Sequence, residues 1–350
     1  MEEKKSKIKA LVLSVIFVMG LVVLVGLCDF CLARQGYVHD ILEVVHNGYE
    51  KESLVEQNGQ EELDNTNSTG YDTLILGASH GRSAINPKYI DEALNCKCLN
   101  LCIPGETVKD SYYLLLEALK TNDVKRVIID ADYQYYLGDQ AEGQFEEAFI
   151  YNQLSWTSST KWKYLFDNVN KLDFRNAISK RDVYTHSPSE IKDNIIKKVS
   201  DDCNIYNLQV QDSGGPYKGN GFFYREKTSS FYSGYMDGHA FCYDDQVDDM
   251  PAKYFDKIKE ICDKKGITIC AVTSPIPKQS CIEVHMDKIN QTMSDFFNKE
   301  DVVYLNFNDL KEDELNTDYS NYVDAEGHMC GELAEVYSKL LSEKLAELYS

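Results

Sequence analysis

Positive charge is scarce in this chain of 350 residues, which carries 36 lysines and arginines against 57 aspartates and glutamates. The difference, 36 − 57, gives a formal net charge of −21 at pH 7 with histidine neutral. Proteins bind nucleic acids largely by neutralising phosphates with lysine and arginine, so this balance argues against a nucleic-acid partner. The chain also lacks internal repeats and low-complexity tracts. Because 43% of its residues are hydrophobic, most of the chain can bury a core.

Charge is absent altogether from residues 10–28, a run of 19 residues that follows four lysines in the first nine positions. As a helix this run spans about 28 Å, close to the thickness of the hydrocarbon core of a bilayer. Few basic residues follow it soon, the first two being Arg34 and Lys51. The positive-inside rule therefore predicts a single-pass anchor, with the N-terminus in the cytoplasm and the rest of the chain outside.

Two other uses of this apolar run compete with an anchor. A cleaved signal peptide requires a small-x-small site, and none follows the run cleanly. Lipidation at Cys28 requires a small residue just before the cysteine, where Leu27 stands. We therefore predict an uncleaved anchor over residues 1–30. A polar, acidic stalk with a membrane-proximal helix is expected over residues 31–70, and one ordered domain over residues 71–350.

Nine of the eleven cysteines lie in the presumed outer region, an odd number that complete pairing in an oxidising setting does not fit. The set fits an organism that lives under reducing conditions. Cys96, Cys98 and Cys102 are close in sequence, but they lack a partner histidine at a metal-like spacing, so no zinc site is predicted. Cysteines in or beside apolar stretches are expected to act as small hydrophobic residues, and these are Cys98, Cys262, Cys270 and Cys330.

Apolar runs of strand length alternate with amphipathic helical stretches from residue 71 to the C-terminus. This alternation predicts a parallel sheet with helices on both faces, a doubly wound α/β sandwich. Such sheets hold their site at the carboxyl ends of the strands. The predicted strands lie within residues 71–77, 97–103, 125–131, 266–275 and 301–308, and the predicted helices are 87–94, 107–121, 252–265, 284–298 and 331–349.

Residues 134–250 interrupt the alternation. They contain amphipathic stretches at residues 161–177 and 188–199, and an irregular part with the sequence GGPYKGNGFFYRE. An insertion of this length is typical of a lid or substrate platform over a site, and a structural subdomain is the alternative.

The first predicted strand ends in LGASHGRS, which places Ser79 at a tight turn between strand and helix. A serine there exposes its hydroxyl and gains backbone N–H groups for an oxyanion. Near the other end of the chain, Asp324 and His328 stand in a polar loop just before the last helix. A histidine there can return to Ser79 as a base, with Asp324 fixing its tautomer. The alternatives are that Ser79 is an ordinary turn residue and that His328 only caps the last helix.

These motifs make the chain similar to the SGNH/GDSL hydrolase superfamily over about residues 71–133 and 251–350. In that family the nucleophile lies in a block like LILGASH, which implies Ser79 as the nucleophile and as one oxyanion donor. A second block carries a glycine whose N–H serves the oxyanion, and NLCIPGET implies Gly105.

The chain departs from the family pattern in two of its blocks. The third block ordinarily supplies an asparagine to the oxyanion, and the corresponding stretch, VIIDADYQYY, has none. The last block usually reads D-x-x-H, whereas Asp324 and His328 are separated by one more residue. Either Gly327 absorbs the extra residue or the longer spacing weakens the triad, and Glu326 is the second choice for the acid.

The resemblance implies a flavodoxin-like three-layer α/β/α sandwich of about five parallel strands. It extends to the membrane-anchored group that acts in cell-envelope acylation, such as polysaccharide O-acetylation and teichoic-acid D-alanylation. We expect an extracytoplasmic serine O-acyl esterase or acyltransferase that acts on a cell-envelope glycan or related polymer without a metal or organic cofactor. A multipass membrane acyltransferase is the partner expected. The alternatives are a catalytically inactive envelope protein that binds polymer or such a partner, and a cytoplasmic thioesterase or lipase.

Several other side chains are hypothesised to bind substrate. Arg82 would hold an anionic group, with an ordinary place on the helix surface as the alternative, and Asp130 and Asp132 would position hydroxyls or cap the next element. Stacking on sugar rings or packing in the core is expected for Trp156, Trp162 and Tyr217. The possible substrate-binding residues are thus Arg82, Asp130, Asp132 and Glu326.

Overall fold

The centre of the molecule is a parallel sheet of five strands in the order β2-β1-β3-β4-β5. The computed structural model describes residues 2–33, 42, 45–46, 70–138, 150–168, 177–179, 181, 184–200, 217–227, 246–309 and 315–350. Each strand lies within a run predicted from the sequence, so the predicted sheet is confirmed. The strands are β1 (Thr73–Gly77), β2 (Cys98–Asn100), β3 (Arg126–Asp130), β4 (Thr268–Thr273) and β5 (Val303–Asn306).

The strand order 2-1-3-4-5 is the flavodoxin-like order expected above. Strand β1 is central, and the last residue of β1, Gly77, pairs with Asp130, the last residue of β3. Asp130 in turn pairs with Val272 near the end of β4. The carboxyl ends of three neighbouring strands therefore meet at one edge, where the segments that follow them are brought together.

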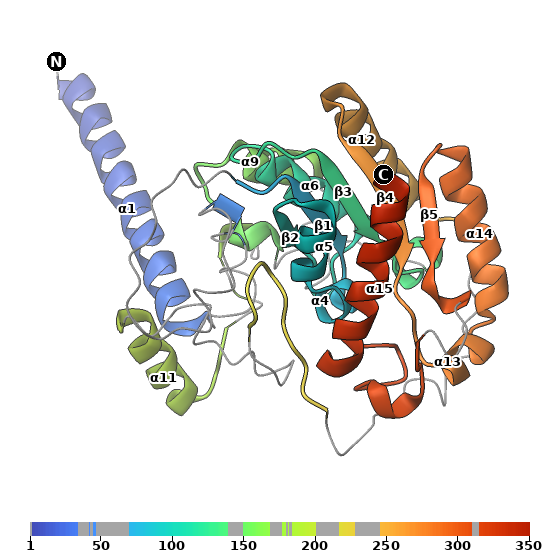
Figure 1. Cartoon of the computed structure of the whole chain (residues 1–350). Coiled ribbons are helices and arrows are strands. Elements are labelled where there is room, and N and C mark those ends of the chain that lie inside the picture. Colours follow the sequence, from blue (N-terminus) through green and yellow to red (C-terminus); the bar gives the residue numbers. More distant parts are fainter. Residues whose placement is uncertain are drawn as a thin grey trace.

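Two hydrophobic cores lie on the two faces of the sheet, because successive side chains of a strand point to opposite faces. Leu74 and Leu76 belong to one core, and Ile75 belongs to the other. The first core is covered by α6 (Val108–Ala118), α12 (Asp249–Lys265) and α14 (Met286–Lys299). The second is covered by α5 (Pro87–Leu94) and α15 (Gly331–Tyr349), so the molecule has three layers, as Figure 1 shows.

Local signals set where the helices begin and end. Helix α6 starts with a capping box, in which the Thr107 side chain accepts from the Asp110 N–H and the Asp110 side chain accepts from the Thr107 N–H. The predicted helix over residues 284–298 is α14 preceded by a separate short helix, α13 (Lys278–Glu283). His285, at a φ of 56°, separates the two, since a left-handed residue cannot continue an α-helix.

The N-terminal helix α1 (Glu2–Leu32) contains the apolar run predicted as an anchor. Its segment Lys4–Leu32 is long and apolar enough to cross a membrane, and none of its most apolar window is buried in the protein. It is the one helix of this kind among the described residues. Most of the stalk predicted over residues 31–70 lies outside the described residues.

Parts of the insertion over residues 134–250 are described and pack in separate places. They include α7 (Gln134–Leu137) and α9 (Ser159–Asn168), of which α9 packs on α6. Helix α11 (Pro188–Val199) lies at the C-terminal end of α1, where the Asn194 side chain donates to the Ala33 carbonyl at 2.8 Å. The segment 217–227 lies against edge strand β2, since the Asn100 N–H donates to the Asn220 carbonyl at 2.9 Å.

The cysteines expected to act as small hydrophobic residues are all buried free thiols. Burial raises the pKa of the Cys262 and Cys270 thiols to about 12, so both stay neutral and pack as apolar groups. The four residues concerned are Cys98, Cys262, Cys270 and Cys330.

Candidate functional site

A tight turn joins the central strand to a short helix and carries Ser79. Strand β1 ends at Gly77, and α4 (Ser79–Ala84) begins two residues later. A Cβ atom on Gly81 would come within 2.8 Å of the Asp130 Cβ and 2.7 Å of the Cys102 Sγ. Glycine at position 81 therefore lets α4 approach the ends of β2 and β3 closely, which fixes the Ser79 hydroxyl at the carboxyl edge of the sheet.

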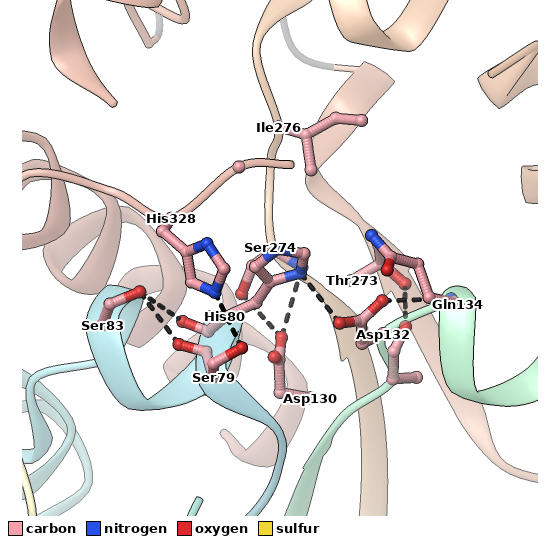
Figure 2. A network of polar contacts seen from close by, with 12 residues as sticks. Ser79, His80, Ser83, Asp130, Asp132, Gln134, Thr273, Ser274, Ile276 and His328 are labelled. Atoms are coloured by element: carbon pink, nitrogen blue, oxygen red, sulfur yellow. Dashed lines mark hydrogen bonds and ion pairs between the residues drawn. The ribbon is translucent and has the colours of Figure 1, made fainter. Parts of the chain in front are cut away.

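Three side chains from the two ends of the chain form one line of hydrogen bonds. The Ser79 Oγ lies 2.7 Å from Nε2 of His328, and Nδ1 of His328 lies 2.7 Å from Oδ2 of Asp324. Figure 2 shows the His328 ring over Ser79, at the start of α4. The serine and histidine are 249 positions apart, so the fold itself brings them together. A serine, a histidine and an aspartate thus stand in the order in which acyl transfer uses a nucleophile, a base and an acid.

The loop between Asp324 and His328 contains one residue more than the resembling family usually has, and Gly327 accommodates it. Gly327 adopts a φ of +116°, which side chains other than glycine rarely allow. A Cβ atom there would lie 2.5 Å from the Ile276 Cγ2. The Asp324 Oδ1 accepts the Gly327 N–H at 3.1 Å and the His328 N–H at 3.2 Å, so the carboxylate also ties the loop together.

Electrostatics favour a neutral base beside a charged acid. Burial would raise the pKa of Asp324, but the hydrogen bond and charge of His328 outweigh burial and lower that pKa to about 2. Burial lowers the pKa of His328, against the opposing hydrogen bond of Asp324, and the nearby charge of His80 lowers it further. At neutral pH His328 is therefore unprotonated at one nitrogen and can accept the Ser79 proton.

The two backbone amides predicted to receive an oxyanion lie in the turns that follow β1 and β2. The Ser79 N–H begins α4, and Gly105 lies in the turn after β2 at a φ of 75°. The Ile103 N–H donates to the Gly77 carbonyl at 3.1 Å, which ties the Gly105 turn to the end of β1. Among the described residues no backbone carbonyl accepts from either the Ser79 or the Gly105 N–H. Both donors predicted for the oxyanion are therefore adjacent to one strand end.

A second histidine and acid lie beside the first. His80 Nδ1 is 2.9 Å from Oδ2 of Asp132, and the His80 and His328 ring centroids are 4.7 Å apart. Asp130 instead accepts the Ser274 hydroxyl at 2.6 Å, and burial raises its pKa to about 6. No role was predicted for His80 or Ser274. The available signal was the position of His80 directly after Ser79, and nothing in the sequence marked Ser274.

The remaining predicted residues take different places. Arg82 is buried, with its guanidinium 4.1 Å from the centre of the Phe223 ring, so the alternative of an ordinary place on the helix surface is wrong. Burial, followed by the charge of Asp324, raises the pKa of Glu326, which lies near His80 and Arg225. Arg225 comes from the insertion, and its carbonyl accepts the Gly331 N–H at 2.7 Å at the start of α15. Part of the insertion thus reaches the rim of the site.

The three aromatic residues suggested for sugar stacking separate into two groups. Trp156 and Trp162 are 48% and 42% exposed and lie 5.5 Å apart, beside the exposed Phe166. Tyr217 is buried against Phe223 and belongs to the core. Only the two tryptophans are therefore open to a ligand.

Comparison with known proteins adds little to this geometry. No family model and no curated protein matches the sequence. Among solved structures, a protein of Bacteroides fragilis described as a candidate acylhydrolase aligns with 85% of this chain and 95% of its own. The identity is 7% and the TM-score is 0.36. At these values the alignment carries no functional information, so function is inferred from the site.

Proposed function

We propose that this chain is a membrane-anchored, extracytoplasmic serine O-acyl esterase or acyltransferase that acts on a cell-envelope glycan or related polymer. The observation that supports it is the hydrogen-bonded line of Ser79, His328 and Asp324, with 2.7 Å at both links. Such an arrangement converts a weakly nucleophilic hydroxyl into one that attacks acyl carbonyls.

In the first half of the reaction the Ser79 Oγ attacks the acyl carbonyl carbon. The new bond forms as His328 Nε2 takes the hydroxyl proton, and the carbonyl oxygen becomes an oxyanion that faces the N–H groups of Ser79 and Gly105. Asp324 stabilises the imidazolium formed on His328 through the 2.7 Å hydrogen bond. His328 then gives its proton to the leaving alkoxide, the ester bond breaks, and the acyl group is held on Ser79.

In the second half an acceptor hydroxyl attacks the acyl-enzyme. His328 removes the proton of that hydroxyl and returns it to Ser79 Oγ when the acyl–Ser79 bond breaks. With water the outcome is hydrolysis, and with a sugar hydroxyl it is acyl transfer. The anchor favours transfer, because a multipass membrane acyltransferase in the same bilayer can supply the acyl group.

The N-terminal apolar helix supports a substrate outside the cytoplasm. Four lysines precede the apolar segment of α1, which by the positive-inside rule places the domain outside. With a net charge of −21, broad attraction to an anionic polymer is unfavourable, so local contacts must supply recognition.

A fluorophosphonate probe tests the chemistry directly. In the full-length chain, Ser79 Oγ should displace fluoride from phosphorus and become covalently labelled, and Ser79→Ala should abolish labelling. The control is Ser83→Ala, which removes a buried hydroxyl that donates to the Ser79 and His80 carbonyls in the same helix but makes no hydrogen bond with Ser79 Oγ. Labelling of the Ser79→Ala protein equal to that of the parent chain, or no labelling of either, would contradict the proposal.

The substrate is tested in cells that depend on the chain. Envelope glycans from parent and Ser79→Ala cells are compared by mass spectrometry, and the expected result is a changed content of ester-linked acyl groups. Unchanged acylation in Ser79→Ala cells, with a defect only on deletion of the whole chain, would instead indicate an inactive protein that binds polymer or a partner.

A further inference from the structure

A buried histidine that the triad does not use lies at the site. His80 directly follows Ser79, is 5% exposed, and makes an ion pair of 2.9 Å with Asp132. Its ring centroid is 4.7 Å from that of His328 (Figure 2). Two imidazoles thus share the site, and only His328 is bonded to the Ser79 hydroxyl. The triad of Ser79, His328 and Asp324 gives no role to His80.

The groups around His80 keep it in the cationic form. Acidic neighbours are Asp132 and Asp130 at the end of β3, and Asp324 and Glu326 in the loop before α15. Burial alone would lower the pKa of His80, but Asp132 and the other carboxylates outweigh burial and raise that pKa to about 9. The pKa of Asp132 is lowered by the same pairing, which outweighs its own burial. The cations that act on this loop are His80 itself and Arg225.

A cation beside a general base is unfavourable in the resting site at neutral pH. It lowers the pKa of His328, which weakens the base, and it opposes the imidazolium that His328 becomes during the reaction. The cation also has a second N–H group, on Nε2, and within the described part of the chain nothing accepts from it. The unfavourable effect on His328 is offset, and the Nε2–H gains an acceptor, when negative charge develops next to Ser79 during acyl transfer.

We propose that the His80 imidazolium, held in place by Asp132, is an additional catalytic residue that stabilises the negative oxygen of the tetrahedral intermediate. This inference rests on the proposed acyl-transfer function. His80 would act together with the Ser79 and Gly105 N–H groups, and it would supply charge where VIIDADYQYY offers no asparagine. Asp132 would be a positioning residue, since its other oxygen, Oδ1, accepts the Gln134 N–H at 3.0 Å and is thereby fixed at the start of α7.

The test compares the parent chain with the double variant His80→Gln/Asp132→Asn in 4-nitrophenyl acetate hydrolysis. Replacing both members avoids a buried carboxylate without a partner, which a single His80 replacement would leave. Loss of one oxyanion donor lowers kcat by about 10²–10³-fold, so we expect a kcat loss of that size with KM little changed. Circular dichroism checks the fold. A folded double variant with kcat within about threefold of the parent value would overturn the inference.

A pH profile gives a second, independent readout. In the parent chain kcat should fall as pH rises through about 9, because His80 then loses its charge. In Asp132→Asn the pKa of His80 loses its main support, so this alkaline limb should move down toward the ordinary histidine pKa of about 6.5. An alkaline limb that does not move would overturn the inference even if the double variant fails to fold.

Labelling distinguishes a failure of this inference from a failure of the proposed function. Endpoint labelling of Ser79 by the fluorophosphonate depends on the nucleophile, and the His80 variants should reach the same stoichiometry more slowly. Complete labelling with an unchanged kcat rejects the role of His80 alone. No labelling of the parent chain rejects the serine chemistry itself.

Discussion

Replacing Asp324 with asparagine exchanges one carboxylate oxygen for an NH₂ group and so tests the geometry of the triad. The Asp324 Oδ1 accepts two backbone N–H groups, from Gly327 at 3.1 Å and His328 at 3.2 Å, while Oδ2 faces the His328 ring at 2.7 Å. Because both backbone groups need an acceptor, asparagine must keep its oxygen on that side and turn its NH₂ group to the ring. Nδ1 must then accept, which moves the ring proton to Nε2, against Ser79.

A His328 protonated at Nε2 cannot take the proton of the Ser79 hydroxyl. In serine hydrolases with this arrangement, loss of the correct tautomer lowers kcat by about 10⁴. At about 1.36 kcal/mol per factor of ten, this corresponds to about 5.4 kcal/mol of activation free energy. The measurements are 4-nitrophenyl acetate hydrolysis and the rate of fluorophosphonate labelling by the full-length chain at neutral pH. Circular dichroism should show an unchanged fold, because asparagine has nearly the shape of aspartate.

Glu326→Gln is the matched control. It removes the same charge two positions away in the same loop, and Glu326 makes no hydrogen bond with His328 in the described structure. We expect a far smaller loss of activity in this variant. Equal losses in the two variants would mean that only the charge of the loop matters, and near-parent activity of Asp324→Asn would refute the assignment of the triad.

Two further predictions follow from the pKa of the base and from the loop that carries it. Because the pKa of His328 is lowered, its neutral form persists to lower pH. The acid limb of the plot of kcat against pH should therefore have its midpoint below the ordinary histidine pKa of about 6.5. A midpoint above about 6.5 would contradict the electrostatics described for the site. Gly327→Ala should reduce the free energy of unfolding in urea by about 1–3 kcal/mol and lower activity, since the new Cβ meets Ile276 at 2.5 Å. Gly266→Ala, also at positive φ but with open space around it, is the control and should cost only the backbone strain of about 1–2 kcal/mol and no activity.

Much of the fold was predictable because its signals are local. Five apolar runs and the helical stretches between them carry the periodicity of a parallel sheet, and the crossover rules leave few ways to arrange them. Ser79 and His328 were predictable because each directly follows or precedes a regular element at one edge. The break at His285 was not, because a single left-handed residue interrupts a sequence whose amphipathic pattern continues.

The charged surroundings of the triad were not predictable from local sequence. His80 becomes an ion-paired cation only because the segment after β3 brings Asp132 to it. Arg82 resembles a helix surface residue in sequence, but Phe223 from the insertion covers it. Each of these contacts joins residues from different parts of the chain. The pattern of a single segment does not indicate which distant residues will lie against it.

The segment 217–227 protects the sheet as well as bordering the site. Strand β2 is an edge strand of three residues, and an uncovered edge can pair with a strand of another molecule. The Asn220 carbonyl occupies the Asn100 N–H, and farther along the same segment the Arg225 carbonyl holds the Gly331 N–H near His328. Removing the insertion would therefore free a template for intermolecular strand pairing and loosen the start of α15 at the same time. We therefore expect a chain without the insertion to self-associate through β2.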